Sequence, residues 1–173
     1  EQAKTSLRRS DMTINIGEVL PNYTLSRFGT KGLENVQLHD FIGNNKVILF
    51  GVPGAYSRTC SSKHLPSFIK TMEDFKEKGI EKVICIAVND PFVMASWDND
   101  TGASKAGIDM LCDPSSALIK KIGLNFDAEP IGFFDRSKRF AMIINNKKVE
   151  LLNVDDDSGI CDLSAGETIL SFL

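Results

Sequence analysis

Short apolar runs between polar segments predict the strands of this chain. Residues 46–50 and 83–88 are apolar almost throughout, a pattern typical of strands that are covered on both faces of a sheet. Shorter runs at residues 36–38 and 110–112 predict two more strands. Because buried strands need a layer packed against each face, we expect helices in the segments between them.

The C-terminal part of the pattern predicts a hairpin and a final helix. Residues 139–144 and 147–154 indicate two strands joined at an Asn-Asn pair, which is typical of a tight hairpin turn. Ser164 and Glu167 then form a capping-box pattern, in which the two side chains satisfy the first free amides of a helix. The sequence therefore predicts a last helix directly after this pair.

Helical composition occupies three segments between the strands. Residues 57–78 predict a long helix that ends at Gly79, a favourable residue just past a helix C-terminus. Pro66 should kink this helix because its ring removes one backbone donor. Residues 91–105 and 115–122 predict two further helices.

The order of these elements indicates the fold class. Strand–helix alternation followed by a hairpin and a helix predicts an α/β sandwich with a mixed sheet. This is also the element order of a thioredoxin-like fold, although the order alone does not identify that fold. The sequence contains no internal repeat and no linker, and 173 residues fit one domain. We expect a single domain at residues 13–173, after a disordered tail at residues 1–12 that lacks an apolar pattern. A remnant of an organelle-targeting segment is the alternative interpretation of that tail.

Charge and composition exclude several classes of function. Hydrophobic residues at 42% and charged residues at 25% are typical of a soluble globular protein. The net charge of −3 argues against a nucleic-acid surface, which is normally basic. No apolar run approaches the roughly 18 residues of a membrane span, and no signal-peptide core is present. We therefore expect an intracellular protein, cytoplasmic or organellar (mitochondrial or plastid-like), with no nucleic-acid or membrane partner.

The four cysteines are Cys60, Cys85, Cys112 and Cys161. They include no C-x-x-C motif and no pair with zinc-finger spacing, so they are interpreted as thiols of a reducing compartment. Cys85 and Cys112 lie in predicted strands, where a cysteine usually serves core packing. Neither a metal nor a bound cofactor is expected.

Two polar features have both an ordinary and a functional interpretation. His64 lies four residues after Cys60, on the same helical face. A Cys–His nucleophile pair or two metal ligands are the functional alternatives, and a structural helix residue is the interpretation that we favour. The Asp run at residues 155–157 is predicted to be a solvated turn, because no start within it supplies the glycine that a calcium-binding loop needs.

Cys60 differs from the other cysteines because it follows a Pro-Gly turn and lies where a helix is predicted to begin. A cysteine reacts as its thiolate, and at an ordinary pKa of about 8.5 only about 3% is ionised at pH 7. Free amides at a helix start favour the anion. Full ionisation gains only about 30-fold in rate, so transition-state stabilisation must supply the rest. Ser57, one turn earlier, and a cation from elsewhere in the chain are the donors that we expect.

At this point the residues match a known family. The stretch P-G-A-Y-S-R-T-C from Pro53 to Cys60 resembles the peroxiredoxin signature P-x-x-x-[TS]-x-x-C. The S-S-K-H-L-P that follows, the V-N-D-P-F-V segment with Trp97, a later D-P pair and R-S-K-R-F-A-M at residues 136–142 are similar to the type V or plant type II (atypical) branch. The resemblance covers most of the chain and implies a thioredoxin-like fold, with a mixed central sheet flanked by helices and an N-terminal β-hairpin extension.

The resemblance also implies a role for each residue of the site. Cys60 would be the peroxidatic cysteine, which attacks one peroxide oxygen and becomes a sulfenic acid. Pro53 would shield that intermediate, and Gly54 would allow a close backbone approach. Ser57 would hydrogen-bond the thiolate or the peroxide, and Arg139 would hold both electrostatically.

The chain departs from the branch at two of these positions. Ser57 stands where Thr is common, so the hydroxyl survives and the stiffening methyl is lost. Tyr56 stands where Phe is usual and adds a hydroxyl of unknown use. Arg136 and Lys138 flank the expected cation closely, and the choice of Arg139 among them rests on the resemblance.

Two routes remain open for reduction of the sulfenic acid. Cys161 is a candidate resolving cysteine because it lies where animal type V members carry one, although an ungapped alignment places it two residues upstream. The S-A-x-E-x-I-L ending resembles plant-type members, which lack that residue and use glutathione or glutaredoxin. A disulfide requires Cα atoms within about 7 Å, so Cys60 would reach Cys161 only after local unwinding of the first helix. The sequence slightly favours an external thiol.

The function implied is a thiol-dependent peroxidase, an antioxidant oxidoreductase in cell redox homeostasis. It would reduce hydrogen peroxide and small alkyl hydroperoxides to water or alcohol, with glutathione/glutaredoxin or thioredoxin as reductant. The alternative is a redox relay that passes oxidation from Cys60 to a partner protein; a thiol–disulfide transferase is disfavoured by the missing C-x-x-C. The family also implies a homodimer, for which Phe92 and Trp97 are candidate face residues, although scattered aromatics are normally core.

Overall fold

A computed structural model describes residues 13–173 of the chain. The tail predicted at residues 1–12 lies outside the described residues. The boundary at residue 13 and the assignment of one domain stay predictions.

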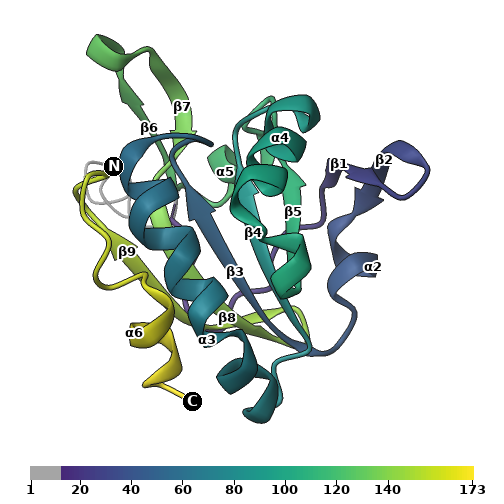
Figure 1. The fold of residues 1–173 in the computed structure, drawn as a ribbon. Helices are drawn as coiled ribbons and strands as arrows, with labels where there is room; N and C mark the ends of the chain where they lie inside the picture. The colour runs from purple at the N-terminus through teal and green to yellow at the C-terminus, as the bar shows by residue number, and fades with distance from the viewer. Residues whose placement is uncertain (1–12) are drawn as a thin grey trace, which may run out of the picture.

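Seven strands of the described chain form one mixed sheet in the order β2-β1-β5-β4-β3-β8-β9. β3, β4 and β5 run parallel, and β8 pairs antiparallel with β3. Two other strands form a separate ribbon, which projects from one end of the molecule (Figure 1). The strands are β1 (Thr24–Gly29), β2 (Gly32–Gln37), β3 (Lys46–Val52), β4 (Lys82–Ala87), β5 (Ile108–Cys112), β6 (Asn125–Ala128), β7 (Phe133–Ser137), β8 (Arg139–Asn145) and β9 (Lys148–Asp155).

Helices flank the sheet, as the sequence predicts. α3 and α4 cross the same face of it, and α6 packs beside α3 (Figure 1). The helical elements are α2 (Leu38–Ile42), a π-helical turn (Cys60–His64), α3 (Leu65–Glu77), α4 (Pro91–Thr101), α5 (Ala117–Lys121) and α6 (Gly166–Leu170), with short 3₁₀ turns at Ser104–Ala106 and Glu129–Ile131.

Two hydrophobic clusters cover the opposite faces of the sheet. Phe50 and Ile48 of β3 belong to the cluster under α3 and α4, whereas Val47 and Leu49 belong to the cluster that includes α2 and α5. β4 alternates in the same way. The apolar runs at these strands therefore reflect burial on both faces, which confirms the prediction.

The N-terminal β-hairpin extension is also present. β1 and β2 pair antiparallel at one edge, and β1 meets β5 where Ser26 lies opposite Cys112. The strand predicted at residues 36–38 overlaps only the last residues of β2, because Leu38 is already the first residue of α2. The apolar pattern alone gives no sign of β1, β6 or β7, because their apolar residues are few and interrupted by polar ones. Only the resemblance implies β1, as part of the hairpin extension.

The predicted long helix is broken near its start. Leu65 donates its backbone N–H to the carbonyl of Cys60, five residues earlier, which defines the π-helical turn. Pro66 is the second residue of α3, where it has no N–H to give to the preceding turn. The break in helical phase therefore comes immediately before the proline.

Three local predictions are wrong or shifted. The capping box is wrong, because α6 has Ala165 as N-cap without a side-chain cap, and the Ser164 hydroxyl donates to Asp155 Oδ2 at 2.6 Å. The predicted solvated turn at residues 155–157 is wrong only for Asp155, which is buried, whereas Asp156 and Asp157 are exposed. The hairpin turn lies one residue later than predicted, at Asn146 and Lys147, whose positive φ values of 52° and 67° suit a tight turn.

Candidate active site

Cys60 lies where the chain leaves the carboxyl end of β3 and enters the π-helical turn. Residues 53–59 form the connection, and Cys60 is the first residue of the turn. Its side chain is fully buried, whereas Tyr56 and Arg58 are exposed. Single π-helical turns are frequent at functional sites, where they alter the direction of one or two side chains.

Ser57 and Cys60 are in direct contact. Ser57 Oγ lies 2.7 Å from Cys60 Sγ and 2.8 Å from the carbonyl oxygen of Gly54. The hydroxyl has one proton, so it donates to one of these acceptors at a time. A thiolate carries a full negative charge and is the stronger acceptor, so ionisation of Cys60 draws the hydroxyl proton toward sulfur.

Arg139 reaches the same sulfur from β8. Its Nη2 donates to Cys60 Sγ at 3.1 Å, although the two residues are far apart in the sequence. Nε and Nη2 also donate to the carbonyl of Ser158, at 3.1 and 2.9 Å. The side chain is buried, so its positive charge acts on the sulfur with little screening by water.

Arg136 supports the loop on the other side of the cysteine. Its Nη1 donates to the carbonyl of Pro53 at 3.1 Å, and its guanidinium lies 4.6 Å from the centre of the Phe133 ring. A Cβ at Gly54 would come within 2.6 Å of the same Arg136 nitrogen. The absence of a side chain at Gly54 thus leaves room for Arg136. From the sequence, Arg136 was considered only as an alternative to Arg139 for the cation beside Cys60.

His64 joins the group through Arg139 rather than through the cysteine. His64 Nδ1 lies 3.0 Å from Arg139 Nη1, and His64 Nε2 lies 3.0 Å from the carbonyl oxygen of Ser164. The ring is fully buried and packs at a tilt against Phe50 and Phe68, which stack on each other. Burial, together with the positive charge of Arg139, lowers the pKa of His64 to about 3. Sequence spacing identified the shared face of Cys60 and His64 but gave no sign of the arginine between them.

The loop that carries Cys161 is folded around Asp155. The Asp155 carboxylate accepts the backbone N–H groups of Asp162, Leu163 and Ser164 as well as the Ser164 hydroxyl. These bonds lower the pKa of Asp155 against the opposing effect of burial, so the carboxylate stays ionised. The loop of residues 156–164 is therefore held as a compact structure.

The same loop also contacts the segment around Cys60. The Thr59 hydroxyl donates to the carbonyl of Gly159 at 2.9 Å, and Arg139 and His64 contact the carbonyls of Ser158 and Ser164. A movement of this loop would therefore change the contacts of Thr59, His64 and Arg139.

The four cysteines are free thiols in distinct environments. Cys161 is half-buried, and burial raises its pKa to about 11. Burial raises the pKa of Cys112 to about 12, and that of Cys85 well above its usual range. These three thiols are therefore protonated at neutral pH, and Cys60 is the one that contacts a cation and a hydroxyl.

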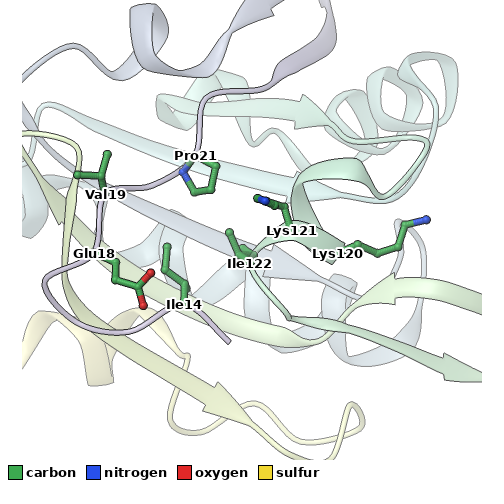
Figure 2. Close-up of a pocket in the computed structure, with 7 residues that line it drawn as sticks. All are labelled: Ile14, Glu18, Val19, Pro21, Lys120, Lys121 and Ile122. Atoms are coloured by element: carbon green, nitrogen blue, oxygen red, sulfur yellow. The ribbon is translucent and has the colours of Figure 1, made fainter. Parts of the chain in front are cut away.

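A pocket of about 400 Å³ lies away from Cys60, between the segment around Ile14 and the end of α5 (Figure 2). Glu18 and Lys121 line it, and none of its lining residues is a cysteine. A second hollow of about 360 Å³ lies beside Cys161, with Lys63 and Lys70 in its lining.

Among the described residues 13–173, no group of three or more His, Cys, Asp or Glu side chains could hold a metal ion. Within the same range, no helix has the length and apolar character needed to cross a membrane.

Comparison with known proteins gives consistent similarities. The model of the Redoxin family matches residues 16–170. Peroxiredoxin-2D of Arabidopsis thaliana is 40% identical over 161 residues, which are 92% of this chain and 98% of the relative. Peroxiredoxin-2E-2, chloroplastic, of Oryza sativa subsp. japonica is 35% identical over 161 residues, which are 91% of this chain and 72% of the relative. The crystal structure of reduced Prx3 in complex with H₂O₂ from Vibrio vulnificus matches with a TM-score of 0.87 at 38% identity, over 92% of this chain and 99% of that chain.

Proposed function

The chain belongs to the peroxiredoxin family of thiol-dependent peroxidases, and on that premise we propose that it reduces hydrogen peroxide and small alkyl hydroperoxides through Cys60. The observation that carries the proposal is the convergence of Ser57 Oγ and Arg139 Nη2 on Cys60 Sγ, at 2.7 and 3.1 Å. The similar Vibrio vulnificus protein is described in complex with H₂O₂, which supports the choice of substrate.

The oxidative step follows from this geometry. The Cys60 thiolate attacks one peroxide oxygen, an S–O bond forms, and the O–O bond breaks with its electron pair on the departing oxygen. That oxygen takes a proton and leaves as water or an alcohol, so one thiol and one peroxide give one sulfenic acid. Negative charge moves from sulfur to oxygen during this step, and Arg139 and Ser57 are the donors positioned to stabilise it.

Pro53 and Gly54 complete the proposed site. Pro53 is buried next to the loop that leads to Cys60, where it would shield the sulfenic acid from water. The contact of Arg136 with the Pro53 carbonyl holds this backbone in position. Because Cys60 is fully buried, a peroxide reaches its sulfur only when neighbouring residues move, and a small peroxide needs the smallest opening.

The sulfenic acid is reduced by thiols, which lose two electrons in total. One thiol condenses with it to give a disulfide and water, and a second thiol then releases Cys60. We propose glutathione with glutaredoxin, or thioredoxin, as the external source. The half-burial and raised pKa of Cys161 disfavour it as the first attacking thiol while its loop is folded. An intramolecular disulfide of Cys60 with Cys161 requires that loop or the π-helical turn to open.

Assembly and compartment stay predictions. Phe92 is exposed and stacks edge to face with Phe28, so it remains a candidate for the face of a homodimer. Trp97 is fully buried in the described chain, so it does not belong to that face. A chloroplastic relative agrees with an organellar location as one option.

Peroxide consumption with a thiol reductant tests the proposal. Cys60→Ser should abolish activity, whereas Cys161→Ser should keep it when glutathione/glutaredoxin or thioredoxin is supplied. Activity that survives Cys60→Ser contradicts the assignment. Slow turnover accompanied by a mixed disulfide with one specific protein would instead favour the redox relay.

Mass spectrometry after one equivalent of peroxide identifies the reductive route. A Cys60 adduct with added glutathione supports the external thiol. A crosslink between Cys60 and Cys161, formed in preference to that adduct, supports the intramolecular route.

A further inference from the structure

Arg139 and His64 together determine the protonation state of the histidine. A guanidinium has no acceptor and keeps its proton in proteins, so Arg139 Nη1 is the donor in its 3.0 Å contact with His64 Nδ1. Nδ1 therefore carries no proton. Nε2 then carries the proton and donates it to the Ser164 carbonyl at 3.0 Å. The ring is neutral, and both of its nitrogens are engaged.

Two of the three acceptors of the Arg139 guanidinium belong to the π-helical turn. Cys60 is the first residue of the π-helical turn and His64 is the last, and the guanidinium donates to both. The remaining acceptor, the Ser158 carbonyl, lies in the loop of residues 156–164. The histidine thus connects the orientation of Arg139 to the same backbone turn that carries the sulfur.

We propose that His64 is a positioning residue, which holds the Arg139 guanidinium against Cys60 Sγ by accepting a hydrogen bond at Nδ1. This inference rests on the proposed function and assigns His64 no contact with the peroxide. Without the acceptor, Nη1 would be a buried charged donor with no partner, and the guanidinium would turn to find one.

The charged groups around His64 are consistent with this role. Arg139 faces it from β8, Asp155 acts on it from β9, and Cys60 lies on its own turn. A proton on Nδ1 would remove the acceptor and place a second positive charge against the guanidinium. The low pKa of His64, about 3, keeps the ring neutral over the pH range in which a peroxidase works.

Three substitutions separate positioning from simple packing. His64→Asn retains an acceptor near Nδ1, and His64→Gln retains a donor near Nε2. His64→Phe fills the space beside Phe50 and Phe68 with neither group. The measurement is the kcat/KM for hydrogen peroxide with a saturating reductant, alongside thermal unfolding to establish that each variant folds.

The proposal predicts that the acceptor decides the rate. His64→Asn should keep the kcat/KM within about threefold of the wild type, and His64→Gln and His64→Phe should lower it about 10- to 100-fold. Any other ranking overturns the proposal, in particular a His64→Gln variant as active as His64→Asn. A role in packing alone predicts losses that follow thermal stability rather than the acceptor.

If the His64 variants do not fold, NMR of the wild-type protein tests the proposal through the tautomer of the His64 ring. The chain has only two histidines, so ¹⁵N-histidine labelling gives two rings, with His39 as the second. The proposal requires His64 to stay in the neutral Nε2–H form between pH 8 and pH 5. The opposite tautomer, or a positive ring near pH 6, overturns it.

The two hypotheses fail separately. A wild-type protein without peroxidase activity ends the proposed function, while the NMR spectrum still tests His64. An active protein that loses activity on Cys60→Ser but shows the wrong ranking of His64 variants ends only the positioning role.

Discussion

The indole Nε1–H of Trp97 donates a hydrogen bond of 2.9 Å to the hydroxyl of Ser61, the residue that follows Cys60. Trp97 is fully buried on α4. The same helix receives the Tyr56 hydroxyl, which donates to Asp100 Oδ2 at 2.7 Å. α4 therefore holds the chain on both sides of Cys60.

Trp97 should report the oxidation of Cys60. It is the only tryptophan of the chain, and its polar partner lies next to the sulfur, so a change in the π-helical turn alters its environment. Stopped-flow fluorescence should show a change on addition of peroxide that has the rate of sulfenic acid formation. The signal should vanish in Cys60→Ser and shrink in Ser61→Ala. An unchanged signal in Cys60→Ser would show that it arises elsewhere.

Tyr56→Phe should loosen the loop before Cys60. The substitution removes the bond to Asp100 and the 2.6 Å contact with Ser96, and it leaves the backbone in a positive-φ conformation of 65° that these contacts help to hold. Hydrogen exchange of the amides in residues 54–62 should become faster, by less than about tenfold because the bonds are solvent-exposed. Tyr23→Phe, at the other tyrosine, is the matched control and should leave this segment unchanged. Equal protection in both variants would contradict the role of the Tyr56 hydroxyl.

Arg139→Lys should be a severe change despite the retained charge. Arginine donates through Nε, Nη1 and Nη2 to Ser158, His64 and Cys60, and a lysine cannot reach all three acceptors at once. We expect the kcat/KM for peroxide to fall at least about 100-fold. Lys138→Arg, at the neighbouring position, should have little effect. Near-normal activity of Arg139→Lys would mean that a point charge is sufficient.

His64 should make the protein less stable in mild acid. Its folded pKa of about 3 lies below the ordinary value of 6.5, so the unfolded chain takes up a proton first as the pH falls. The stability contribution is complete above pH 6.5 and declines toward pH 3, by up to about 1.4 kcal/mol per pH unit.

Urea unfolding at pH 7 and pH 5 measures this loss. The difference in unfolding free energy between the two pH values should be smaller in His64→Asn, because that variant has no proton to gain. Identical pH dependence in the two proteins would contradict a neutral buried ring.

Release of the loop around Asp155 should expose Cys161. Asp155→Asn weakens the bonds to the amides of Asp162, Leu163 and Ser164 because the acceptor loses its charge. Alkylation of Cys161 by iodoacetamide, followed by mass spectrometry at pH 8, should therefore be faster than in the wild type. Asp156→Asn, at an exposed neighbouring position, is the control. Equal rates in both variants would contradict the anchoring role of Asp155.

The features that the sequence alone determined are those that depend on residues close together along the chain. The apolar runs of β3 and β4 report burial on both faces, and the segment from Pro53 to Cys60 carries the turn, the hydroxyl and the thiol within eight residues. Such features depend on neighbours along the chain, so a single sequence is enough to expose them.

Only the tertiary structure determined the contacts between residues that are distant in the sequence. Arg136, Lys138 and Arg139 lie close together in the sequence. The pairing of β8 with β3 places Arg139 against the Cys60 sulfur, while Arg136 donates to the carbonyl of Pro53. Ser164 was a plausible cap until Asp155, from the end of β9, provided a charged acceptor for its hydroxyl. Long-range hydrogen bonds of this kind compete with local ones, and their outcome depends on strand pairing and burial that no short stretch of sequence contains.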